Sequence, residues 1–122
     1  MAFLHGRIAL SAVIFAFALG AWGSWNYLRR QGVSPSYWGA LVIGEILMLV
    51  QGAIGVLLVI AGEQPGDLLH FLYGVLVALT WPAVYVCTKA QTGRSEGGFY
   101  TLASFFIFGL AIRAIMTGTA GR

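Results

Sequence analysis

The sequence is poor in charge and in the residues that usually build soluble active sites. Only 9% of its 122 residues are charged, and it has one cysteine and two histidines. So little charge excludes a soluble domain with a polar surface. The single cysteine, Cys87, excludes an internal disulfide. No serine or cysteine has a histidine and an acid at sensible spacing, no phosphate-binding glycine loop is present, and we expect no nucleic acid partner.

Apolar residues, by contrast, make up 59% of the chain and gather into four long stretches. About 20 residues cross the ~30 Å hydrocarbon layer of a membrane. The stretches cover residues 6–28, 37–61, 67–88 and 98–117, with breaker-rich connections between them. We therefore predict an all-α membrane protein, a single up-down bundle of four transmembrane helices over residues 1–122. We expect the first stretch to be a retained helix rather than a cleaved signal peptide.

The charges in the connections predict an orientation. The cations lie in the first and third connections: Arg29, Arg30, Lys89 and Arg94. The second connection holds two acids, Glu63 and Asp67, and no cation. Because positive loops stay in the cytoplasm, we expect both termini on the outer side of a prokaryotic cytoplasmic membrane. Asp67 is also a good candidate to cap the third helix.

The two histidines are the residues most informative about function. His5 lies at the mouth of the first apolar stretch and His70 near the start of the third. An imidazole is costly to hide in hydrocarbon and is a good axial ligand for haem iron. Because the first and third helices run in the same direction, both rings lie at similar depth near the outer side. We interpret His5 and His70 as the metal ligands of one haem, with hydrogen bonding of His70 to a neighbouring carbonyl as the alternative.

Two arginines lie near the same side of the membrane. Arg7 is at the outer end of the first stretch, and Arg113 is in the outer half of the fourth. An arginine inside a helix costs about 2.5 to 3.5 kcal/mol to insert. Arg7 and Arg113 are therefore candidates to bind haem propionates, although snorkelling to the surface explains Arg113 as well.

Small residues recur at helical spacing on the first two stretches. The first carries His5, Ala9, Ala12, Ala16 and Gly20, and the second carries Gly44, Met48, Gly52 and Gly55. Such stripes usually let helix backbones approach closely, and they also suit a slot for a flat macrocycle. Several tyrosines and one tryptophan lie near the inner boundary: Tyr27, Tyr37, Trp38, Tyr85 and Tyr100. We interpret these as an interfacial belt.

From His5 to about Lys89 the order of motifs is similar to a known family. His5-Gly6-Arg7 opens an Ala/Leu-rich helix that Arg29-Arg30 closes, Gln51-Gly52-x-x-Gly55 follows in the next, and Leu68-Leu69-His70 opens the third. This order resembles one half of the heme A synthase family, whose halves are four-helix bundles around a haem. The resemblance implies that His5 and His70 ligate iron and that Gln51, Gly52 and Gly55 pack beside the cofactor.

The departures from that family limit what is carried over. Gly6 separates the histidine from the arginine, where the family has the two adjacent. The acidic residue that the family places before its first histidine, tied to oxidation of the haem methyl group, has no counterpart. The resemblance therefore implies binding of a b-type haem, for electron transfer or haem handling, and not heme A synthesis.

Glu45 supports a rival interpretation. It lies in the inner half of the second stretch, where an ionised carboxylate is expensive, so we expect it to be protonated, paired with Asn26 or a loop cation, or part of a proton path. A small proton-coupled transporter is one alternative, although no Trp-Tyr-rich substrate motif is recognisable around Glu45. A cofactor-free accessory subunit of a respiratory or photosynthetic complex is another. We expect the partners of the chain to be the lipid bilayer and either a larger membrane complex or further copies of the chain in a homo-oligomer.

Overall fold

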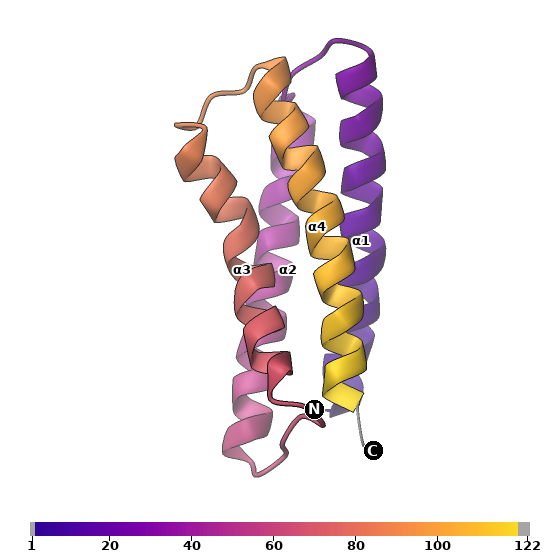
Figure 1. Cartoon of the computed structure of the whole chain (residues 1–122), viewed down its shortest axis with the longest axis vertical. Coiled ribbons are helices and arrows are strands. Elements are labelled where there is room, and N and C mark those ends of the chain that lie inside the picture. Colours follow the sequence, from indigo (N-terminus) through magenta and orange to yellow (C-terminus); the bar gives the residue numbers. More distant parts are fainter. Residues whose placement is uncertain (1, 120–122) are drawn as a thin grey trace.

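The computed structural model describes residues 2–119, which form four antiparallel helices (Figure 1). They are α1 (Ala2–Leu28), α2 (Pro35–Ile60), α3 (Leu69–Cys87) and α4 (Arg94–Thr119), and there is no strand in this part of the chain. Each helix is long and apolar enough to cross a membrane. The predicted four-helix transmembrane bundle is confirmed over the described residues; residue 1 and residues 120–122 of the predicted domain lie outside them.

Both ends of the described chain lie at one end of the bundle, together with the α2–α3 connection (Figure 1). The other two connections lie at the opposite end. Each helix packs against its neighbours in the order α1, α2, α3, α4 and back to α1, so α1 and α3 occupy opposite corners, as do α2 and α4. Residues that point inward from α1 and α3 therefore meet across the centre of the bundle.

All four helix starts differ from the predicted ones by two to four residues. α1 begins at Ala2, so His5 is inside the helix and not at its mouth. α3 begins at Leu69 with Leu68 as its N-cap residue, so the prediction that Asp67 caps this helix is wrong, although the Asp67 carboxylate accepts a hydrogen bond from the Leu69 amide at 2.9 Å. α2 begins close to its predicted start, where the Ser34 hydroxyl accepts from the Tyr37 amide at 3.1 Å.

The start of α4 lies four residues before the predicted one, because Gly97 and Gly98, which were expected to break the helix, are helical. α4 begins at Arg94, and the Gly97 amide donates to the Gly93 carbonyl at 3.0 Å. A side chain at Gly97 would lie 3.6 Å from the Gly32 backbone. That is an ordinary contact distance, whereas a side chain at Gly32 would collide with the Thr92 carbonyl oxygen, so Gly32 is the residue that allows the α1–α2 connection to approach the α3–α4 connection closely.

The small stripe of α1 packs against α4. Ala12, Ala16 and Gly20 are buried, and a side chain at Gly20 would lie 2.7 Å from the Phe105 ring. One turn further along, a side chain at Gly23 would collide with the Thr101 hydroxyl. The packing interpretation therefore holds for this part of the stripe.

Two members of the expected aromatic belt belong to the core. Tyr37 and Tyr100 are only 1% and 2% exposed. The Tyr37 hydroxyl donates to the Leu19 carbonyl at 3.0 Å, so the phenol is buried with its polar atom satisfied. The belt interpretation is wrong for these two residues. A tyrosine at a given depth near the membrane boundary can face either lipid or the interior of the bundle, and its position in the sequence does not tell which.

Large apolar side chains cover the outside of all four helices. Examples with more than half of their surface exposed are Ile14, Ile43, Leu79 and Phe106. In water such a surface would drive association, whereas lipid solvates it. The exposed surface and the four spanning helices agree with an integral membrane protein.

Candidate functional site

The two histidines of the chain meet inside the bundle at the end that holds the chain termini. His5 lies in the first turns of α1 and His70 in the first turn of α3, and both are half-buried. Their ring centroids are 6.1 Å apart and their ring planes are inclined at 68°. Because α1 and α3 occupy opposite corners, the two rings approach each other across the centre of the bundle.

A hydrogen bond fixes the His70 ring. Its Nδ1 atom lies 2.7 Å from the Ala114 carbonyl oxygen in α4. A carbonyl can only accept, so Nδ1 carries the proton in this bond and the Nε2 atom keeps its lone pair. Metal-binding histidines are commonly held in this way, with the second ring nitrogen bonded to a backbone carbonyl.

Glycines stand beside both rings on the other two helices. A side chain at Gly55 in α2 would lie 3.2 Å from His5 Cε1, and one at Gly118 in α4 would lie 2.9 Å from His70 Cε1. The four corners of the bundle therefore contribute histidine, glycine, histidine and glycine at this level. We call the set His5, Gln51, Gly55, His70, Ala114 and Gly118 the histidine end.

Two further hydrogen bonds connect the elements of the histidine end. The Gln51 side-chain amide in α2 donates to the His5 carbonyl oxygen at 2.8 Å. The Gly66 amide, in the α2–α3 connection, donates to the Gly118 carbonyl oxygen at 3.1 Å. These bonds tie α1 to α2 and the connection to α4, so the backbones that carry both histidines are held in place.

The remaining predicted site residues do not join this cluster. Gly52 is exposed, and a side chain there would meet nothing within 4 Å. Arg7 and Arg113 are exposed at the same end of the bundle, and the Arg7 guanidinium lies 5.2 Å from the centroid of the Phe3 ring. Both arginines are near the histidines in height and lie on the outer surface.

The histidine end suits a haem better than a bare metal ion. Within residues 2–119 there is no group of three or more histidine, cysteine or acidic side chains that could hold a metal ion. A structural zinc site needs four protein ligands, whereas haem iron needs only axial ligands because the porphyrin supplies the others. Two imidazoles without a third donor therefore match the requirement of a haem.

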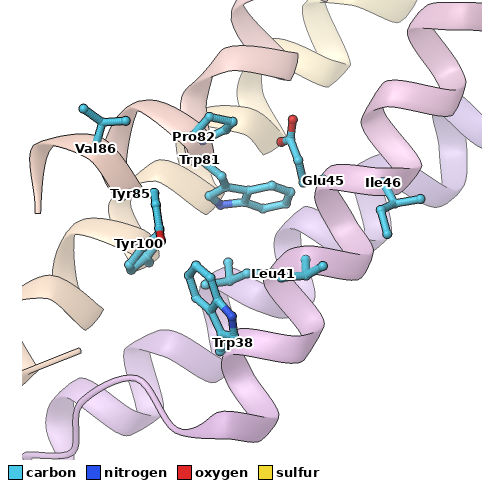
Figure 2. A pocket seen from close by; sticks show the side chains of 10 residues that line it. Trp38, Leu41, Glu45, Ile46, Trp81, Pro82, Tyr85, Val86 and Tyr100 are labelled. Carbon is cyan, nitrogen blue, oxygen red and sulfur yellow. The ribbon is translucent and has the colours of Figure 1, made fainter. Parts of the chain in front are cut away.

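A cavity that the sequence does not indicate lies beside Glu45. It has a volume of about 340 Å³ and is lined by the Glu45 side chain and by aromatic side chains from three helices (Figure 2). Trp38 comes from α2, Trp81 and Tyr85 from α3, and Tyr100 from α4. We call these four residues, with Glu45 and the apolar lining, the aromatic pocket.

Glu45 therefore does have Trp and Tyr neighbours, but they come together only in the folded bundle and form no motif in the sequence. The aromatic residues are up to 62 positions apart in the sequence and converge only through helix packing. The spacing of Trp38, Leu41 and Glu45, three and four residues apart, is the one local sign that they share a helix face. Glu45 Oε1 is buried without a hydrogen-bond partner among the described residues, so the expected pairing of this atom with Asn26 or a loop cation is absent.

Comparisons of the chain with family models, curated proteins and solved structures find no match.

Proposed function

We propose that this chain is an integral membrane haem-binding protein in which His5 and His70 would hold one b-type haem through their ring nitrogens. The observation that carries the proposal is the 6.1 Å separation of their ring centroids. Two imidazoles on one iron have centroids about 6 Å apart, because each iron–nitrogen bond is about 2 Å long and each nitrogen lies about 1 Å from its ring centre.

The neighbours of the two rings support this role. The Ala114 carbonyl selects the tautomer of His70 in which Nε2 is available as a ligand. Gly55 and Gly118 keep side chains away from the rings, and Gln51 holds the first turn of α1 through the His5 carbonyl. When bound, haem supplies one-electron chemistry, which suits electron transfer or haem handling. We propose that role for the chain, either alone or as a subunit of a respiratory or photosynthetic complex.

The first test is a visible absorption spectrum of the detergent-purified protein from haem-supplemented cells, before and after dithionite. We expect a Soret band that shifts on reduction. His5→Ala and His70→Ala should each abolish or convert that spectrum, because one axial ligand is lost. The matched control is Phe71→Ala, which removes an exposed ring next to His70 and should leave the spectrum unchanged.

Two outcomes of this experiment would contradict haem binding by His5 and His70. A folded, helical protein with no Soret band would overturn the proposal, and so would histidine variants that keep the parent spectrum. In either case the bond between His70 and Ala114 would be a purely structural contact, as in an accessory subunit without a cofactor.

We further propose that the histidine end faces the outer side of a prokaryotic cytoplasmic membrane, following the distribution of loop cations. The chain offers its own reporter, because Cys87 is exposed at the end of α3 on the opposite side of the bundle. A membrane-impermeant maleimide should label Glu63→Cys in a Cys87→Ser background in intact cells. Cys87 itself should react only after the membrane is opened. Labelling of Cys87 alone in intact cells would reverse the orientation.

A further inference from the structure

A groove lies between α3 and α4 at the end of the bundle away from the histidines. It is lined by side chains within residues 83–88, at the end of α3, and within residues 99–106 of α4, and its volume is about 460 Å³. This volume is in the usual range of ligand-binding cavities. In Figure 1 the C-terminal half of α3 leans away from α4 towards this end. We call this cavity the α3–α4 groove.

The direction of the groove is that of a lipid chain. Phe99 lies in the second turn of α4 and Phe106 two turns deeper, so the groove extends about 10 Å along the bundle axis from the connection into the membrane. Acyl chains enter a bilayer in the same way, with the headgroup at the surface and the chain parallel to the spanning helices.

The lining of the groove offers contacts to an apolar ligand. Phe99 and Phe106 are each more than half exposed there. The polar side chains in the lining are Cys87 and Thr88, and the Thr88 hydroxyl already donates to the Val84 carbonyl oxygen at 2.7 Å. A ligand inside the groove therefore gains apolar contacts and needs no polar group of its own at that depth.

The end of the bundle at which the groove begins is positively charged. Within residues 2–119 the charged residues at this end are one acid, Glu96, and four cations, Arg29, Arg30, Lys89 and Arg94. Lys89 is exposed and directly follows Thr88 in the groove lining. Arg94 is held against α1, where its Nε atom donates to the Tyr27 carbonyl oxygen at 2.9 Å. Lys89 is therefore the cation nearest in the chain to the mouth of the groove.

This charge distinguishes between two occupants of an apolar groove in a membrane. A second copy of the chain, inserted in the same orientation, would bring the same excess of cations to the contact, and like charges side by side cost affinity. An anionic lipid brings a phosphate to the same place, and basic residues beside membrane helices bind such headgroups. The charge at this end therefore favours a lipid.

We propose that the α3–α4 groove binds one anionic glycerophospholipid of the phosphatidylglycerol class. One acyl chain lies in the groove, and the Lys89 ammonium group pairs with the headgroup phosphate. The groove shares no residue with the histidine end, so this proposal and the haem proposal stand or fall separately.

The test is a titration of the delipidated protein with phosphatidylglycerol in detergent, with native mass spectrometry to count the bound lipids. We expect one lipid to bind saturably. Ala83→Trp should weaken its binding at least about tenfold, because Ala83 lines the groove and the indole ring takes the place of the acyl chain. Ala21→Trp, at an exposed position on α1 outside the groove, is the matched control and should leave the dissociation constant unchanged.

The headgroup is tested by phosphatidylcholine with the same acyl chains, whose choline adds a positive charge. It should bind roughly fivefold more weakly, and Lys89→Gln should lower the affinity for phosphatidylglycerol to a similar extent. Glycerophosphoglycerol, which has the headgroup without the chains, should not compete.

Three outcomes overturn the proposal. One is an Ala83→Trp protein that circular dichroism shows to be folded and that binds phosphatidylglycerol like the parent. Another is a parent protein with equal affinity for the two lipids. The third is a parent dimer that Ala83→Trp separates into monomers, which would assign the groove to a second copy of the chain.

Discussion

The two halves of the bundle differ in how far their polar side chains are hydrogen-bonded, although each contains a buried oxygen without a partner among the described residues, Gln51 Oε1 at the histidine end and Glu45 Oε1 in the aromatic pocket. At the histidine end, His70 and Gln51 are each hydrogen-bonded to a backbone carbonyl of another helix. In the aromatic pocket, Glu45 Oε1 is buried without a partner among the described residues. A polar group that is hydrogen-bonded to the protein stabilises one arrangement, whereas an unsatisfied buried group destabilises the protein. The hydrogen bonds of His70 and Gln51 therefore help to fix the histidine end, whereas Glu45 Oε1 makes no such contribution.

The largest expected effect concerns the glycines of the histidine end. Gly55→Leu should lower the affinity for haem at least about tenfold, because a side chain there starts 3.2 Å from His5 Cε1 and forces the ring aside. Gly52→Leu is the matched control on the same helix, since Gly52 is exposed with nothing within 4 Å. The measurement is the haem-to-protein ratio after titration of the apoprotein. Equal loss in both variants would mean that α2, and not the site, had been damaged.

The second prediction is that removing the Glu45 carboxyl group stabilises the bundle. Glu45→Leu should raise the free energy of unfolding by about 2 kcal/mol, because it replaces an unsatisfied buried carboxylate by an apolar side chain. Denaturation in mixed SDS and detergent micelles measures the stability. Glu63→Leu in the exposed connection should change it by less than about 0.5 kcal/mol.

A destabilised Glu45→Leu protein would contradict the comparison between the two halves. It would mean that Glu45 makes a favourable interaction with the protein in the membrane. Glu45 would then resemble His70, whose ring is hydrogen-bonded to the Ala114 carbonyl oxygen.

The meeting of the two histidines follows from features that the sequence contains. In an up-down bundle the first and third helices are parallel, so His5 and His70, each near a helix start, lie at the same end. The ring separation and the Ala114 hydrogen bond do not follow, because they depend on the register of α4 against α3. That register comes from packing contacts such as those of Gly118.

The aromatic pocket shows what sequence patterns miss in a membrane protein. Lipid-facing and buried surfaces are both apolar, so hydrophobic periodicity does not reveal the rotation of a helix. The sequence therefore predicts that Tyr100 faces the membrane boundary, whereas in the structure it is buried and lines the pocket beside Trp38. Positions of helices along the membrane normal can be predicted from length and charge, whereas the faces that they turn inward cannot.

The smallest expected effect belongs to Gln51, whose amide nitrogen is hydrogen-bonded while its Oε1 atom is buried without a partner among the described residues. Gln51→Leu should lower the free energy of unfolding by about 0.6 to 1.7 kcal/mol, the usual value of a hydrogen bond between membrane helices, because the bond to the His5 carbonyl is lost. Val50→Leu, on the exposed neighbouring position, is the control and should be neutral. If Gln51→Leu stabilises the protein as Glu45→Leu is expected to, then the bond to His5 does not offset the cost of burying the amide. The two halves would then differ only in the charge of their polar groups.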